Sequence, residues 1–450
     1  MDPIELSEHV RALLAANRVD APGGHRYTRP AAGTYPHQWL WDSCFHALIH
    51  HWLGDRQMAH DELRALFRAQ VEDGPDRGRL PHMTLHADGA GEQYARDVAL
   101  WGSPRASSIT QPPLVAQVAL EVGDPTLWRE LWRPLAAYHD WWLRRRDPRD
   151  EKLVVCHHVW ETGADATPRA DGAFQRLLAT GRTPRALDKG TVNLTARKRP
   201  ELLAARFLML EDLQAIDAAE LSGALSPTQA DRRRLELYGH VAVEMQAFLC
   251  AALGAMGAIG DALGETAAAA GYRGEAAAVA RAVNQHLWDE ERGWYVDRWG
   301  EPARPIHAMT YAPFVALHAG DLVPPGRAAR LLAHLGDPAT FATRWPVPTA
   351  AKSDPSFDPD EYWRGSTWLN VNWFIVRGLA AAGRRAGDER FLAAARRVAR
   401  ASLEVVDVAG FREYYRSDGE TAAGFGPEGF SWSGLALDLA RMLEAGELGR

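Results

Sequence analysis

The chain has 450 residues, of which 46% are hydrophobic and 24% are charged, and its formal net charge is -7. This length and composition are typical of a globular protein that forms one large domain or several smaller ones. The negative charge, together with the lack of a Lys/Arg block interleaved with aromatic residues, argues against nucleic acid or an anionic membrane surface as the main partner.

Helical periodicity dominates the sequence from its first residues onward. Apolar residues at a spacing of three to four predict helices over residues 4–17, 39–53, 55–72, 110–121, 126–146, 200–218, 227–263, 265–288, 324–335, 366–385, 388–405 and 431–444. Short links join several of these segments, which is typical of antiparallel helix pairs. Two apolar runs, KLVVCHHVW at 152–160 and RGWYVDRWG at 292–300, predict brief strands or extended loops. Strands and helices do not alternate, so a parallel sheet is not expected.

Residues 161–200 interrupt the helical pattern with a stretch rich in Gly, Thr, Pro and charged residues. Long irregular loops inside compact domains are usually functional or disordered. We expect this loop region to fold over a substrate. No linker or repeat divides the chain, so we expect a single domain over 1–450 that carries long loops on one face.

The remaining general features concern the cell compartment. The first residues, MDPIELSEHVRALLAANR, are acidic and helix-patterned and do not resemble a secretory signal. No stretch reaches about 18 uninterrupted apolar residues, so we expect no membrane span. Cys44, Cys156 and Cys250 lie far apart in unlike contexts, which fits a reduced compartment and gives no metal-ligand spacing. We therefore expect a cytoplasmic protein that uses neither a metal nor another cofactor.

Tryptophan is unusually frequent, with 17 Trp against 13 Phe and 11 Tyr. Flat indoles suit the apolar faces and polar edges of a sugar. In YPHQWLWDSCFH, Asp42 lies directly beside Trp41 at the start of a predicted helix. Asp42 could cap this helix, because short acids accept the amide hydrogens of a first turn. It could equally accept hydrogen bonds from a ligand.

Several stretches place acid or amide side chains in loops or at helix starts, mostly beside aromatic residues. They are HQWLWDS, SITQPP, VWETGADATP, EYWRGSTWLNVNW and FREYYRSDGETAAGFGPEGFSWS. A glycosidase needs two carboxyl groups across one glycosidic bond, one protonated and one ionised. The candidates are Asp165, its rival Glu161 in the same motif, and Glu413 beside two tyrosines. On residue type alone, each of them could be an ordinary surface acid.

These motifs, in this order and approximate spacing, resemble the bacterial members of glycoside hydrolase family 63, in particular the mannosylglycerate and glucosylglycerate hydrolases. The resemblance extends from about Tyr35 to Leu443. It implies an all-α (α/α)6 toroid, or six-hairpin barrel, with long loops over one face. It also implies metal-free hydrolysis of an α-glycosidic bond with inversion, and a small sugar as the substrate.

The resemblance also assigns residues, with Asp165 as the proton donor and Glu413 as the general base. Around the substrate it places Tyr35, Trp39, Trp41, Asp42, Gln111, Trp160, Gly163, Arg206, Tyr362, Trp363, Gly365 and Trp368. The family often has Ser-Gly-x-Asp-Asn where this chain has Thr-Gly-Ala-Asp-Ala, and Asn-Pro where this chain has Arg416-Ser417. These departures leave the acid and base in place and affect the aglycone end.

The substrate stays open at this stage. A glycerate carboxylate would need a nearby cation or helix N-terminus, and the candidate cations are Arg206, Arg364, Arg412 and Lys189. Glu428 could repel an anionic aglycone if it points inward. The alternatives are an α-glucosidase or trehalase-like enzyme that acts on a neutral di- or oligosaccharide, and a non-catalytic carbohydrate-binding protein. Exposed helix faces could also support a homo-oligomer.

Overall fold

The computed structural model describes residues 3–21, 24–87, 90–185 and 198–449, and this part of the chain is predominantly helical. Its α-helices are α1 (Pro3–Asn17), α2 (Leu40–Trp52), α3 (Arg56–Phe67), α4 (Glu92–Trp101), α5 (Val115–Val122), α6 (Pro125–Arg145), α7 (Asp171–Leu178), α9 (Pro200–Leu221), α10 (Pro227–Leu237), α11 (Val243–Leu263), α12 (Thr266–His286), α13 (Ala312–Val315), α14 (Pro325–Gly336), α15 (Leu369–Ala386), α16 (Glu389–Ala409) and α17 (Ala436–Glu444).

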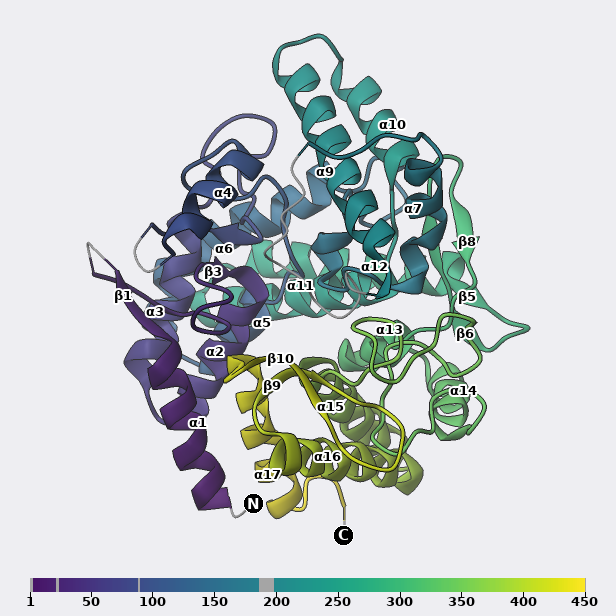
Figure 1. Ribbon diagram of the computed structural model, residues 1–450. Helices are drawn as coiled ribbons and strands as arrows, with labels where there is room; N and C mark the ends of the chain where they lie inside the picture. The colour runs from purple at the N-terminus through teal and green to yellow at the C-terminus, as the bar shows by residue number, and fades with distance from the viewer. Residues whose placement is uncertain (1–2, 22–23, 88–89, 186–197, 450) are drawn as a thin grey trace.

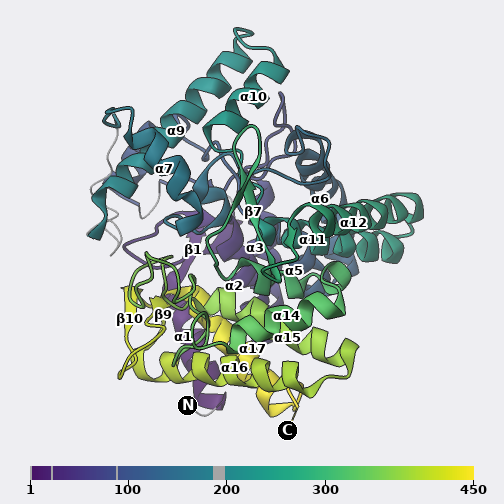
Figure 2. The ribbon, with the colours of Figure 1, turned by 90° about the vertical axis from the view of Figure 1, so that its right-hand side faces the viewer.

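Consecutive helices pack as pairs in which one member is buried and the other exposes a face. The pairs α2–α3, α11–α12 and α15–α16 make extensive contacts. The sequence of α11 is apolar around its whole circumference, whereas α12 buries one side through Ala269, Tyr272, Val279 and Val283. In Figures 1 and 2 the α9–α10 pair projects at one end of the molecule, and α1 packs against α17 at the other.

By length and composition alone, α11 could cross a membrane, and 83% of its most apolar window is buried inside the protein. Its run of apolar residues is interrupted by Glu244 and Gln246, whose side chains are buried and paired with Arg169 and the backbone of Val154. Burial of this extent, with satisfied polar groups, is that of a core helix.

Two helix predictions differ from the structure at identifiable residues. The segment 227–263 forms two helices instead of one, because the chain turns at Gly239 with a φ of 47° and a Cβ there would lie 2.6 Å from the carbonyl oxygen of Leu235. The predicted helix at 110–121 begins only at Val115, after Pro112 and Pro113. Helices α4, α7 and the short α13 were not predicted, and α7 lies inside the region expected to be irregular.

Short strands make the fold mostly helical instead of strictly all-α. The described residues form five two-stranded antiparallel sheets. They are β1 (Arg18–Ala21) with β2 (His25–Thr28), β3 (Gln38–Trp39) with β4 (Met83–Thr84), β5 (Trp288–Asp289) with β6 (Trp294–Tyr295), β7 (Asp297–Trp299) with β8 (Arg304–Ile306), and β9 (Arg412–Tyr415) with β10 (Gly424–Glu428). The strand prediction at 292–300 is confirmed, and the run at 152–160 is extended, with a single β-bridge, before the short 3-10 helix η2 (Val159–Thr162).

Buried ion pairs fix the chain after η2 against the core. Arg169 donates to Glu244 of α11 at 2.5 Å and to Asp297 of β7 at 2.7 Å, and all three side chains are almost fully buried. His240 contacts the same Asp297 carboxylate at 2.9 Å. This network holds the first part of the 161–200 region in a defined position, while residues 186–197, including Lys189, lie outside the described residues.

Candidate active site

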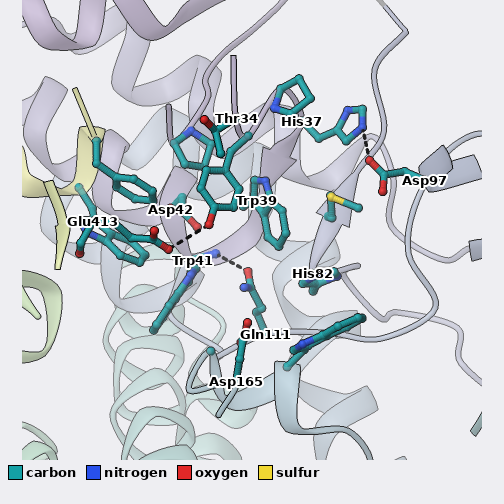
Figure 3. A pocket seen from close by; sticks show the side chains of 18 of the residues that line it. Thr34, His37, Trp39, Trp41, Asp42, His82, Asp97, Gln111, Asp165 and Glu413 are labelled. Atoms are coloured by element: carbon teal, nitrogen blue, oxygen red, sulfur yellow. Dashed lines mark hydrogen bonds and ion pairs between the residues drawn. The ribbon is translucent and has the colours of Figure 1, made fainter. Parts of the chain in front are cut away.

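Loops and helix starts surround a cavity of about 160 Å³ (Figure 3). The start of α2, strand β4, α4, the chain before α5, the segment after η2, α9 and β9 all contribute side chains. Most of the predicted site residues meet here: Tyr35, Trp39, Trp41, Asp42, Gln111, Trp160, Gly163, Asp165, Arg206, Tyr362, Trp368 and Glu413. Segments near the two ends of the chain, which carry Tyr35 and Glu413, therefore line the same cavity.

Trp363 and Gly365 do not line this cavity. The indole of Trp363 is fully buried and stacks on that of Trp368, with 3.8 Å between ring centroids. Gly365 has a φ of 150°, and a Cβ there would lie 2.5 Å from the carbonyl oxygen of Asp358. Trp363 therefore supports Trp368 from behind, whereas Gly365 allows the close approach of the Asp358 backbone.

Glu413, on β9, is held by two tyrosines that are distant in the sequence. The hydroxyl of Tyr35 donates to its Oε1 at 3.0 Å and that of Tyr362 donates to the same oxygen at 3.3 Å. Gly426 of β10 packs against Oε2, where a Cβ would collide with the carboxyl group. Burial raises the pKa of Glu413 to about 8, the charge of Asp165 also raises it, and the two tyrosine hydroxyls lower it. The carboxyl group is thus fixed in orientation and near its titration point at neutral pH.

Asp165 lies just after η2, and in Figure 3 it enters the cavity from below, whereas Glu413 enters from the left. Its local backbone is packed tightly: Gly163 has a φ of 75°, and a Cβ there would lie 2.5 Å from the indole of Trp41. Burial raises the pKa of Asp165 to about 6, against the opposing charge of Arg206. Nη1 of Arg206 is 3.5 Å from Oδ2, so the pairing is weak.

Glu161, the rival acid, has a structural role. Its side chain is fully buried and forms a two-pronged ion pair with Arg146, at 2.6 and 2.7 Å. The backbone N–H of His157 donates to the same carboxylate at 2.7 Å. Glu161 does not line the cavity, so the structure separates the two acids of this motif.

Asp42 faces the cavity from the first turn of α2. The N-cap residue of this helix is Trp39, and it makes no side-chain capping bond. Oδ1 of Asp42 is buried and has no hydrogen-bond partner among the described residues. Burial, followed by the nearby charge of Glu413, raises the pKa of Asp42 well above its usual range. A buried acceptor without a partner is expensive, so this geometry favours a ligand hydroxyl over a cap.

The apolar surface of the cavity is aromatic. The ring of Trp39 packs edge-on against that of Tyr35, with 5.8 Å between ring centroids. The ring of Trp41 packs edge-on against that of Trp432, with 5.6 Å between centroids. The side-chain oxygen of Gln111 accepts a hydrogen bond from the backbone N–H of Trp41 at 3.2 Å. Rings whose orientation is fixed by such contacts can present flat faces to a sugar.

Arg206, from α9, is the sole Lys or Arg among the cavity-lining residues that the structure describes. The residue is 2% exposed, and its Nε and Nη2 have no hydrogen-bond partner within the described chain. Of the other candidate cations, Lys189 lies outside the described residues, and Arg364 and Arg412 are already paired. Arg364 binds Asp171, and Arg412 binds Glu428 at 2.6 Å; the Glu428 side chain is 81% exposed and does not point inward.

Several lining residues were missed in the sequence. Gln93, Asp97, Leu100 and Trp101 all come from the unpredicted helix α4. Asp97 accepts a hydrogen bond from Gln93 at 2.9 Å and contacts Nε2 of His37 at 3.0 Å. Counted from Gln93, the other three residues follow after four, seven and eight positions, so all four share one face of a helix. This periodicity was the signal that could have found them in the sequence.

Comparison with known proteins identifies the family of the chain. The model of the mannosylglycerate hydrolase MGH1-like glycoside hydrolase domain matches residues 35–433. The chain is 35% identical over 428 residues to a mannosylglycerate hydrolase of Thermus thermophilus, covering 91% of this chain and 96% of the relative. It is 26% identical over 480 residues to a glucosylglycerate hydrolase of Mycolicibacterium hassiacum, covering 97% of each.

A solved structure extends the similarity to three dimensions. A family 63 mannosylglycerate hydrolase of Thermus thermophilus, in complex with Tris and D-glycerate, matches with a TM-score of 0.81 at 30% identity. The match covers 97% of this chain and 100% of the other. The family match spans every described motif of the cavity, from Tyr35 to Trp432. The chain therefore belongs to the mannosylglycerate hydrolase MGH1-like family of glycoside hydrolases.

Proposed function

We propose that this enzyme hydrolyses a small α-glycoside of glycerate, mannosylglycerate or glucosylglycerate, with inversion at the anomeric carbon. The observation that carries the proposal is the buried guanidinium of Arg206, whose Nε and Nη2 lack a described acceptor beside the carboxyl group of Asp165. A carboxylate on the leaving group supplies such an acceptor and forms charge-assisted hydrogen bonds with it.

In the proposed reaction the two carboxyl groups act from opposite faces of the sugar. Asp165 gives its proton to the glycosidic oxygen as the bond from that oxygen to C1 breaks. Glu413 takes a proton from a water molecule whose oxygen forms the new bond to C1 from the other side. In such enzymes the carboxyl groups lie about 6.5–9.5 Å apart, which leaves room for the water.

The pKa values of Glu413 and Asp165 allow a form of the enzyme in which the two carboxyl groups share one proton. The pKa of Glu413, about 8, lies above that of Asp165, about 6. The proton of the singly protonated pair therefore resides mainly on Glu413, and the form with the proton on Asp165 is the minor one. Catalysis can draw on this minority form, because activity then follows the total number of protons on the pair.

The rest of the cavity would hold the sugar. Asp42 would accept sugar hydroxyls with its unpartnered Oδ1, and the indoles of Trp39 and Trp41 would lie against apolar ring faces. The hydroxyls of Tyr35 and Tyr362 keep Oε1 of Glu413 occupied, so Oε2 is the oxygen left to receive the proton of the water.

Sequence identity to relatives suggests which of the two glycerate glycosides should be tested first. Identity is 35% to the mannosylglycerate hydrolase and 26% to the glucosylglycerate hydrolase, which supports mannosylglycerate as the first substrate to test. We also infer that the helix pairs close into a single (α/α)6 toroid with the site on its loop face. The alternation of buried and half-exposed helices and the TM-score of 0.81 support this inference.

The test is sugar release from a panel of mannosylglycerate, glucosylglycerate, trehalose, kojibiose and nigerose. We expect release from a glycerate glycoside, and its loss in Asp165→Asn and Glu413→Gln. The matched controls are Asp73→Asn and Glu72→Gln, two exposed acids outside the cavity. Release from neutral disaccharides alone would discard the glycerate substrate and keep the catalytic pair, whereas normal turnover in both catalytic variants would discard the pair.

A further inference from the structure

The active-site cavity continues from Asp165 toward α4 along a series of aromatic rings. Trp160 of η2 is partly exposed, and its ring packs edge-on against that of Trp101 of α4, with 6.0 Å between ring centroids. The imidazole of His82 lies parallel to the ring of Trp160, with 6.5 Å between centroids. These three rings line the same cavity as Asp165. They form an aromatic surface that begins beside the proton donor and reaches α4.

This end of the cavity lies on the leaving-group side of the proposed reaction. Asp165 protonates the leaving oxygen, and Glu413 activates a water molecule on the other face of the sugar, so the leaving group points away from Glu413. In Figure 3, Glu413 lies to the left of Trp39, and Asp97 of α4 lies to its right. The α4 end of the cavity is therefore where a leaving group extends.

The carboxylate of Asp97 is oriented as a hydrogen-bond acceptor at this end. The backbone N–H of His86 donates to Nδ1 of His37 at 3.1 Å, so the ring of His37 carries its proton on Nε2. That N–H donates to Oδ2 of Asp97 at 3.0 Å, and the side chain of Gln93 donates to the same oxygen at 2.9 Å. Oδ1 has no hydrogen bond to a described residue, and no described Lys or Arg pairs with this carboxylate. Oδ1 is thus available to a ligand.

Glycerate alone leaves these groups unused. It has three carbons, and in the proposed complex its carboxylate binds Arg206. Only a hydroxymethyl group remains, which is too small to cover the rings of Trp101 and Trp160 and also to satisfy Asp97 on another element. A pyranose ring has an apolar face that packs on an aromatic ring, and hydroxyl groups at its edge that donate to a carboxylate. The α4 end of the cavity offers this combination of groups.

We propose that the α4 end of the cavity binds a second pyranose ring, so that the enzyme also hydrolyses α-linked disaccharides whose leaving group is a sugar. The second ring packs against Trp160, and one of its hydroxyl groups donates to Oδ1 of Asp97. Asp165 gives its proton to the oxygen of the leaving sugar as the bond to C1 breaks, and water forms the new bond to C1 while Glu413 takes its proton. The inference rests on the proposed function, because it uses the same catalytic pair.

The experiment measures kcat/KM of the full-length protein for two matched pairs of substrates. Mannosylglycerate is compared with an α-linked mannobiose, and glucosylglycerate with kojibiose, so that the two members of a pair differ in the leaving group. In the pair with the preferred sugar, we expect the disaccharide to be cleaved with a kcat/KM within about a hundredfold of that for the glycerate glycoside. Release from the glycerate glycosides alone would overturn the inference and leave the proposed function standing. No release from any of the four would overturn both.

Two variants of α4 test where the second ring binds. Asp97→Asn replaces one carboxylate oxygen by an amide that donates, and Leu100→Trp adds a bulky ring to the lining of the same end. Each should lower the ratio of kcat/KM for the disaccharide to that for the glycerate glycoside about tenfold or more, whereas Arg206→Gln should raise this ratio. The matched controls, Glu92→Gln and Ala99→Trp, change exposed side chains of α4 outside the cavity lining and should not alter the ratio. An unchanged ratio in either cavity variant, or equal changes in the controls, would overturn the proposal.

Discussion

Replacing Glu413 by Gln should stabilise the protein in alkaline solution. The pKa of this buried carboxyl group is about 8 in the fold, against an ordinary value of 4.5. A carboxyl group whose pKa is raised by folding contributes stability that is fully present below pH 4.5 and is lost as the pH rises through 8. Glutamine is neutral at every pH, and its side-chain oxygen can still accept hydrogen bonds from Tyr35 and Tyr362.

The magnitude follows from the two pKa values. The interval from 4.5 to about 8, at 1.36 kcal/mol for each pH unit, corresponds to an upper limit of about 5 kcal/mol. The variant and the wild type should therefore unfold with similar free energies at pH 4.5. At pH 9 the variant should be more stable by several kcal/mol, which is a large fraction of the total stability of a typical protein.

Urea unfolding of both proteins between pH 4.5 and pH 9 measures this difference, with Glu72→Gln as the control for an exposed acid. The difference in unfolding free energy between variant and wild type should widen as the pH rises and should level off above pH 8. A difference that does not change with pH, or a variant that is less stable than the wild type at pH 9, would refute this prediction.

Three kinetic predictions follow from the same site. The pH profile of kcat/KM should be bell-shaped, with an acidic limb near pH 6 and an alkaline limb near pH 8, because the singly protonated pair of Asp165 and Glu413 is the active form. A flat profile across this range would exclude the pair. Arg206→Gln should raise KM for a glycerate glycoside about tenfold to a hundredfold, with little change for a neutral aryl glycoside, and equal losses on both would contradict its role. Tyr35→Phe should move the alkaline limb to higher pH, because the lost hydroxyl lowers the pKa of Glu413, and an unmoved or lowered limb would count against this contact.

Helix periodicity and ordered motifs were sufficient to predict most of the helices and most of the cavity wall. Residue type alone could not separate Asp165 from Glu161, and only the resemblance to the family chose Asp165. The physical reason lies outside the motif, because the partner that occupies Glu161 is Arg146, at the end of α6. The motifs also could not separate Trp368 from Trp363. Both indoles are buried, and only the stacking of one behind the other decides which faces the cavity.

Helix α4 shows a different limit. It is 10 residues long and begins after Gly91, and only its packing next to β4 and Trp160 turns Gln93 and Asp97 toward the cavity. Propensity is a weak predictor for so short an element, whose stability comes from tertiary contacts.

The central claim is that Asp165 and Glu413 hydrolyse an α-glycoside of glycerate by direct attack of water. The most direct test follows the first sugar released from mannosylglycerate by proton NMR, before the anomers equilibrate, with wild type and Asp165→Asn in parallel. Our account predicts that the β-anomer appears first and that the variant releases little or no sugar. Initial release of the α-anomer, or undiminished release by the variant, would contradict it.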